Sequence, residues 1–167
     1  MKRQPDNRVR DYLERWGIMF ERLGSTRMMG KILAWLLVCK PPEQSAKDIA
    51  EAVGASAGSV SGATRGLIAA GMVEKIGVPG RRSGYFRIRE GMWGDVLARK
   101  MLQGREMGEL AREGLSLLSP DDLNGAIRLR EIGSYCTYME RELPTFIDAW
   151  LKEWREEKRQ WTDDEEE

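Results

Sequence analysis

The chain has 167 residues, of which 41% are apolar and 32% are charged, a composition typical of a soluble globular protein. It contains no histidine, the most frequent general base and transition-metal ligand in enzymes. Its two cysteines, Cys39 and Cys136, are too few for a disulfide framework and too widely separated for a metal-ligand motif. The sequence also lacks a phosphate-binding loop and a nucleophile elbow, so it argues against an enzyme, and we expect no cofactor and no metal.

The net charge is zero, but the charge is unevenly distributed along the chain. Residues 24–91 carry ten Lys or Arg against five Asp or Glu, whereas residues 92–167 carry eleven against eighteen. The basic middle predicts an anionic partner, and the acidic end predicts a solvated or assembly role. The polar N-terminus and the short apolar run Ile32–Cys39 favour a cytoplasmic protein without a membrane segment.

Two helices are predicted first. Apolar residues at helical spacing indicate a helix over Asp11–Leu23, and Gly24 ends it. Ser25 or Thr26 then caps a second helix that continues through Cys39. This second helix is apolar almost all round, so we place it in the centre of the core.

Two shorter helices follow, over Ala46–Val53 and Ala57–Ala70. Ser45 opens the first with a pattern close to a capping box, and Gly54 ends it. Ser56 caps the second. A pair of short helices joined by a three-residue turn indicates a helix-turn-helix.

The second of these helices has two different sides on a helical wheel. Its core side holds Ala57, Val60, Ala63, Thr64 and Leu67. The opposite side is small and polar, and its members are Gly58, Ser59, Ser61, Gly62, Arg65 and Ala69. We expect the core side to pack against the rest of the domain and the opposite side to approach a partner surface closely. The alternative is that the small residues pack against a neighbouring helix.

Two short strands, Met72–Val78 and Tyr85–Arg89, flank a Gly/Pro turn that contains Arg81 and Arg82. This pattern predicts a β-hairpin with a basic tip, in which Tyr85 faces outward. The rest of the chain is predicted to be helical. Its expected helices cover Trp93–Leu118, Pro120–Met139 and Leu143–Trp161.

The segment Gly24–Arg89 resembles the winged helix-turn-helix core of MarR-type regulators and, more narrowly, the GbsR branch. The resemblance rests on four motifs, which are G-x-x-R-x-x-G-x-I at the start of the second helix, S-x-x-S-V-S at Ser56–Ser61, A-G-M-V at Ala70–Val73 and P-G-R-R before Tyr85. It implies a mainly α fold with a small β-hairpin, and a homodimer that binds double-stranded DNA.

We therefore expect a transcriptional repressor that acts as a homodimer on a pseudo-palindromic operator, with control by a small-molecule effector left open. The expected regions are an N-terminal helix (1–23) that joins the dimer interface, a winged helix-turn-helix (24–91), a helical dimerisation or effector region (92–162) and an acidic disordered tail (163–167). The alternative is a winged-helix module that binds proteins and not DNA.

The residues expected to contact DNA lie on the recognition helix, the wing tip and two preceding helices. They are Ser45, Lys47, Arg27, Ser56, Gly58, Ser59, Ser61, Gly62, Arg65, Arg81 and Arg82. Hydroxyls and amides at a helix start suit phosphate, Arg65 suits a guanine or a phosphate, and the two wing arginines suit the minor groove.

Aromatic residues outside segment 24–91 predict a subunit interface, because a lone helix cannot bury such a stripe by itself. The residues expected there are Trp16, Phe20, Leu143, Phe146, Trp150 and Trp154. An aromatic cage for a quaternary ammonium ligand is an alternative role for the tryptophans. A redox switch formed by the two cysteines is another alternative, although free cysteines are usually buried.

Overall fold

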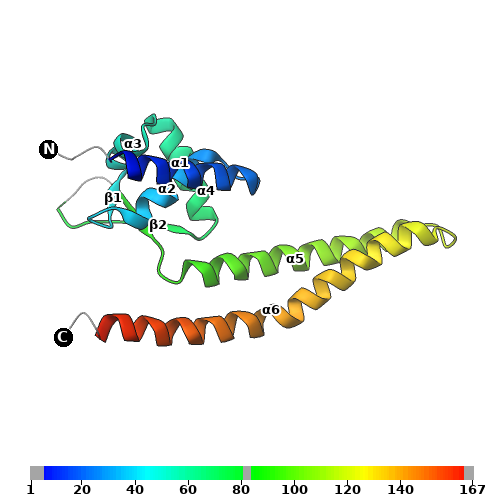
Figure 1. The fold of residues 1–167 in the computed structure, drawn as a ribbon. Helices are drawn as coiled ribbons and strands as arrows, with labels where there is room; N and C mark the ends of the chain where they lie inside the picture. Colours follow the sequence, from blue (N-terminus) through cyan, green and yellow to red (C-terminus); the bar gives the residue numbers. More distant parts are fainter. Residues whose placement is uncertain (1–5, 81–83, 164–167) are drawn as a thin grey trace. The chain divides into compact units, whose positions relative to one another are not determined.

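The computed structural model describes residues 6–80 and 84–163 (Figure 1). It divides into two compact units, which we call unit 1 (Met1–Asp95) and unit 2 (Val96–Glu167). Most described residues are helical, and a small antiparallel sheet lies in unit 1. In the described part of the chain, no helix combines the length and the apolar character needed to cross a membrane.

Unit 1 begins with four helices, α1 (Asn7–Arg22), α2 (Arg27–Val38), α3 (Ala46–Val53) and α4 (Ala57–Ala69). Each starts at a residue whose side-chain oxygen accepts a backbone N–H of the first turn, and these caps are Asp6, Thr26, Ser45 and Ser56. The capping box predicted at Ser45 is present, with Asp48 as its acidic partner. Gly54 ends α3 in a left-handed conformation, with φ of 65°, which glycine adopts without strain.

The sheet has three strands, β1 (Gln44–Ser45), β2 (Val73–Ile76) and β3 (Tyr85–Ile88), in the order β1-β3-β2. The predicted wing is therefore present as the β2–β3 pair, in which Val73 lies opposite Ile88. No sequence pattern predicts β1, which pairs with the other edge of β3. The prediction that Tyr85 faces outward is wrong: its side chain is buried, and it lies between Ser45 and Ile76 in the central strand.

The hydrophobic core of unit 1 draws on all four helices and both long strands. Ile32 and Leu33 of α2 are fully buried, as expected for the central helix. Leu13 and Phe20 of α1 belong to the same cluster. Phe20, which the sequence predicts at a subunit interface, is therefore buried within the core of unit 1 itself.

Unit 2 consists mainly of α5 (Met92–Leu117), which begins in unit 1, and α6 (Leu123–Asp163). Small residues of α5 face α6: a Cβ built on Gly108 would lie 3.1 Å from Cβ of Cys136, and one built on Gly114 would lie 3.1 Å from Leu129. Nε of Arg105 donates a hydrogen bond of 2.9 Å to Glu140. Ala111 and Cys136 are buried, so α5 and α6 form a closely packed pair over this stretch.

The two helices predicted on either side of residue 140 are one helix, and that expected break is wrong. The Asp122 carboxylate accepts the N–H of Gly125 at 2.8 Å, and α6 starts three residues after the expected Pro120. The helix then continues past Pro144, which lies inside it. Proline removes one backbone hydrogen bond and commonly bends a helix. Figure 1 shows α6 bending where its colour changes from yellow to orange.

Candidate nucleic-acid interface

The exposed face of α4 is the feature that stands out in unit 1. Val60, Ala63, Thr64 and Leu67 are buried, as the helical wheel predicted. The residues of the opposite side are all exposed, and they are Gly58, Ser59, Ser61, Gly62, Arg65 and Ala69. Ala57, which the wheel placed on the core side, is exposed because it lies at the first turn, beyond the end of the core cluster.

Two glycines leave this face open. A Cβ built on Gly62 would meet no atom within 4 Å, and one built on Gly58 would meet only the Ser56 hydroxyl, at 4.0 Å. Gly66 is different, because a Cβ there would lie 2.9 Å from the sulfur of Met29 in α2. The close-packing alternative thus applies to Gly66, whereas Gly58 and Gly62 present bare backbone to the outside.

Hydroxyl groups border the open face at the start of α4. The Ser56 hydroxyl accepts the N–H of Ser59 at 3.3 Å, and the two serine hydroxyls lie 3.0 Å apart. One turn further, Nη1 of Arg65 donates a hydrogen bond of 3.0 Å to the Ser61 hydroxyl. The face thus combines hydroxyls, bare backbone and one guanidinium group.

The predicted basic residues outside α4 differ in how their charges are compensated. The Lys47 ammonium is highly exposed and lies 4.0 Å from Glu51. The Ser45 hydroxyl is used inside the protein, since it donates to Asp48 at 2.8 Å and accepts the Asp48 N–H. Arg81 and Arg82 lie outside the described residues. On the wing, Arg87 was not among the predicted residues; its Nε is 2.6 Å from Glu74, which raises its pKa.

Glu14 compensates two cations at the start of α2. Its carboxylate lies 2.6 Å from Nζ of Lys31 and 2.8 Å from Nη2 of Arg27. These bonds, that of Lys31 above all, hold the Glu14 pKa below its usual value. Arg27 therefore reaches the surface with its charge already paired.

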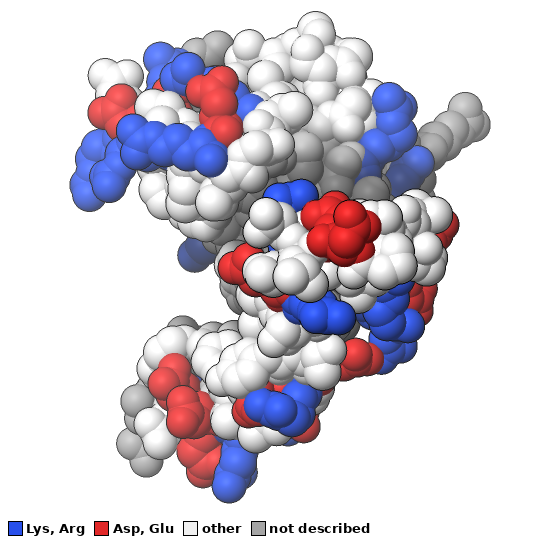
Figure 2. All heavy atoms as spheres, turned by 90° about the vertical axis from the view of Figure 1, so that its right-hand side faces the viewer, with Lys and Arg blue, Asp and Glu red and all other residues white. Residues whose placement is uncertain are grey.

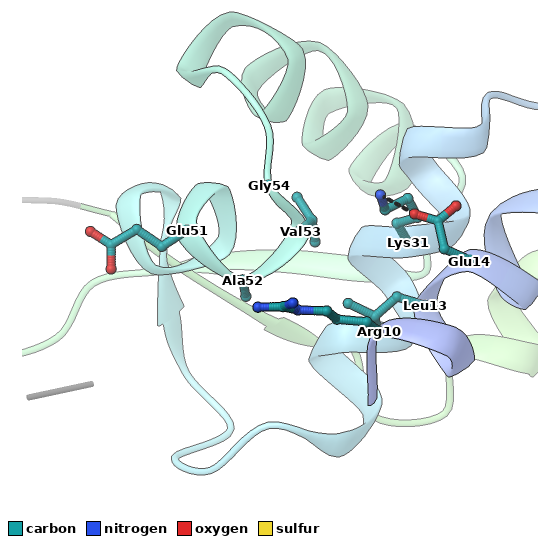
Figure 3. Close-up of a pocket in the computed structure, with 8 residues that line it drawn as sticks. All are labelled: Arg10, Leu13, Glu14, Lys31, Glu51, Ala52, Val53 and Gly54. Carbon is teal, nitrogen blue, oxygen red and sulfur yellow. Dashed lines mark hydrogen bonds and ion pairs between the residues drawn. The ribbon is translucent and has the colours of Figure 1, made fainter. Parts of the chain in front are cut away.

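A pocket of about 330 Å³ opens beside this cluster (Figure 3). Leu13 and Val53 supply apolar lining, and Figure 3 shows the Arg10 side chain extending from α1 towards the end of α3 at Ala52. Glu51 points away from Arg10. A cation beside the C-terminal end of a helix is stabilised by the helix dipole, so Arg10 suits a role in joining α1 to α3.

Comparison with known proteins identifies the family to which the chain belongs. The family model for MmpR5-like MarR family transcriptional regulators matches residues 91–157. The HTH-type transcriptional regulator MmpR5 of Mycobacterium tuberculosis is 36% identical over 140 residues, which cover 84% of each chain. The chain belongs to the MarR family of transcriptional regulators.

A solved structure supports the same assignment for this MarR-family chain. A crystal structure described as that of a transcriptional regulator is 32% identical and superposes with a TM-score of 0.80, covering 87% of this chain and 99% of the other. The predicted winged-helix fold with C-terminal helices is thereby confirmed. Membership of the GbsR branch stays a prediction, since the matched family model is the MmpR5-like one.

The aromatic residues predicted at a subunit interface fall into two groups in this MarR-family protein. In unit 1, Phe20 is buried and Trp16 is half-buried, with 6.1 Å between their ring centroids. In unit 2, Phe146 is 64% exposed. Trp154 packs edge to face on Trp161, with 5.5 Å between the centroids. Figure 2 shows uncharged side chains at the surface among acidic and basic ones.

The two cysteines are buried and lie in different units. Burial raises the pKa of the Cys39 thiol to about 11, so this thiol stays protonated at neutral pH. Its sulfur lies 3.7 Å from the carbonyl oxygen of Leu36. Cys136 is packed against Gly108. A protonated, buried thiol is a poor nucleophile, which disfavours the redox alternative for Cys39.

Proposed function

We propose that this MarR-family regulator is a sequence-specific repressor that binds double-stranded DNA as a homodimer, with α4 in the major groove. The observation that carries this proposal is the exposed face of α4, on which bare backbone, serine hydroxyls and one arginine lie opposite a fully buried side. A helix fits the major groove of B-form DNA, and the absence of Cβ atoms at Gly58 and Gly62 lets the backbone come close to the base edges.

Phosphate contacts complete the proposed interface. Ser56 and Ser59 lie at the positive end of the α4 dipole, where hydroxyls and free N–H groups suit a phosphate. Lys47 lies at the start of α3 with its ammonium exposed. The two wing arginines, Arg81 and Arg82, are proposed to reach the minor groove or its phosphates. The net charge of +5 over residues 24–91 supports an anionic partner.

The proposed homodimer is supported by apolar side chains that unit 2 leaves uncovered. Exposed apolar residues lie along both helices of this unit, and they include Leu102, Leu110, Leu117, Ile127, Tyr138, Phe146 and Trp161. Soluble monomers seldom expose so many large apolar side chains along one pair of helices. Leu143, Trp150 and Trp154 are proposed to lie at the edge of the same interface, and Trp16 to join it from unit 1. A two-fold dimer presents two copies of α4, which suits a pseudo-palindromic operator.

Control by a small-molecule effector is the last part of the proposal. Unit 2 contains a groove of about 290 Å³ between α5 and α6 whose lining is mainly apolar. Its lining includes Met101, Met107 and Met139, flexible side chains that adapt to ligands of different shape. The methionines of this groove suit an apolar part of an effector, and Lys100 and Glu140, which also line it, offer charged groups at the same site.

The test of DNA binding is selection from a pool of duplexes with a randomised centre, followed by affinity measurement at two salt concentrations. We expect enrichment of an inverted repeat and a steep loss of affinity with salt, because most of the binding free energy comes from Lys and Arg on phosphate. Absence of binding at low salt would contradict the proposal and favour the protein-interaction alternative. Binding without sequence enrichment would contradict the sequence-specific part alone.

A further inference from the structure

We propose that Ser61 is a specificity-determining residue that orients Arg65 to read a guanine, an inference that rests on the proposed function of α4. The two residues are one helical turn apart on the exposed face, and Nη1 of Arg65 donates to the Ser61 hydroxyl at 3.0 Å. Because the side chains of a helix lean towards its N-terminus, this bond lays the arginine back along α4.

The surroundings leave the guanidinium group free to meet a partner. Gly58 and Gly62 lie on the same face as Arg65, and neither carries a side chain that would cover it. The described structure records no acidic side chain bonded to Arg65, whereas Arg27 is paired with Glu14 and Arg87 with Glu74. A serine hydroxyl fixes the direction of a guanidinium group without neutralising its charge.

The chemistry of the pair selects one base. Arginine has five N–H donors and no acceptor, and with one donor spent on Ser61 the others remain to point outward. The Ser61 oxygen accepts from Arg65, so its own O–H is left to donate. In the major groove guanine presents two adjacent acceptors, N7 and O6, whereas adenine presents an acceptor beside a donor. The guanidinium group of Arg65 offers donors alone, so it matches the two acceptors of guanine and meets the adenine amino group unfavourably.

Ser61 acts through Arg65 in this proposal, so it is a positioning residue, and affinity alone does not test it. The readout is discrimination, the ratio of affinities for the selected duplex and for the same duplex with adenine in place of one guanine. Arg65→Ala should lower this ratio about 5- to 160-fold, the range for one bidentate contact. Ser61→Ala should lower it about 2- to 10-fold, as expected for the loss of one orienting hydrogen bond.

Two conservative variants separate positioning from a structural role. Ser61→Thr keeps the hydroxyl and should retain the wild-type ratio, and Arg65→Lys keeps the charge but should lose discrimination because an ammonium cannot bind bidentately. The free energy of unfolding should change little in all four variants, since both side chains are exposed.

The outcomes distinguish this inference from the proposed function. A wild-type protein that enriches no sequence overturns the proposed function itself. A wild-type protein that selects a sequence, with Ser61→Ala leaving discrimination unchanged while Arg65→Ala reduces it, overturns the role of Ser61 alone. Selection of adenine at the position that depends on Arg65 also overturns the inference, because bidentate recognition of adenine requires an acceptor that the guanidinium group does not have.

Discussion

Gly30 of α2 lies directly against the backbone of Trp16 in α1, so that a Cβ built on Gly30 would overlap the Trp16 carbonyl oxygen. Gly17 follows Trp16 in α1, and a Cβ built on it would lie 2.8 Å from Cγ of Arg27 in α2. The two helices thus touch backbone to backbone, and α1 is fixed on the core by glycine as well as by Leu13 and Phe20.

Gly30→Ala should therefore destabilise the protein, although alanine is the better helix former. The methyl group can be accommodated only if α1 moves away from α2, and overpacking of this kind costs about 1–3 kcal/mol. Denaturant unfolding at constant protein concentration measures the change. Gly62→Ala is the matched control, and it should raise the free energy of unfolding because its Cβ meets open space. Equal effects of the two variants would contradict the crossing geometry.

Gly58→Ala and Gly62→Ala should each stabilise the protein by up to about 1 kcal/mol and yet weaken DNA binding. The added methyl group meets nothing within the protein, so any loss of affinity must arise from the bound partner. Binding to the selected duplex, measured beside thermal unfolding, separates the two effects. Gly133→Ala, an equally open glycine of α6, should stabilise without loss of binding. Unchanged DNA affinity in the α4 variants would show that the backbone does not approach the groove closely.

Phe146→Ala and Phe20→Ala should act in different ways. Phe146 is 64% exposed and Phe20 is 7% exposed. If Phe146 lies at the subunit interface, its removal should shift sedimentation towards the monomer at micromolar concentration. Removal of Phe20 should lower the stability of unit 1 by about 3–5 kcal/mol, as for other buried aromatic residues. A Phe146→Ala protein that keeps the wild-type sedimentation behaviour at all concentrations would argue against this part of the interface.

The Cys39 thiol should make stability depend on pH in the alkaline range. Its folded pKa of about 11 is above the ordinary value of 9.0, so the folded state holds a proton that the unfolded chain releases. The stabilisation is complete below pH 9 and is lost as the pH rises towards 11, by at most about 2–3 kcal/mol. The change is visible as a falling free energy of unfolding between these pH values, with a smaller slope in Cys39→Ala. Identical slopes in both proteins would contradict the assigned burial of the thiol.

The features that sequence could predict are those encoded locally. Ser45 and Ser56 cap the two helices of the helix-turn-helix, and Gly54 ends the first of them in a left-handed conformation. The residue types and their spacing can be recognised in the sequence alone. The two faces of α4 also follow from spacing alone. Local reasoning also predicts a break between Met139 and Leu143, whereas α6 is continuous there and past Pro144.

Features that depend on residues far apart in the chain were not predictable. The strand β1 is only two residues long, and it exists because β3 lies beside it. Simple alternation along β3 also predicts an outward Tyr85, whereas Tyr85 and its neighbour Phe86 are both buried. Glu14 also gave no signal, since its two partners are 13 and 17 residues away.

Glu14→Gln should strengthen non-specific DNA binding and steepen its dependence on salt. In the wild-type protein the Glu14 carboxylate forms ion pairs with both Arg27 and Lys31. Its removal leaves these two cations uncompensated at the start of α2. If Arg27 contacts DNA phosphate, as the sequence predicts, it then releases a further counterion on binding, and each added phosphate contact raises the salt slope by about 0.9. Fluorescence anisotropy on a duplex of random sequence, at a series of salt concentrations, measures this slope. Glu51→Gln, which frees Lys47 instead, is the matched comparison, because its ion pair of 4.0 Å is long and exposed and should already leave Lys47 available. A Glu14→Gln protein with the wild-type slope would mean that Arg27 lies away from the phosphates, and that Glu14 serves only to hold α1 on α2.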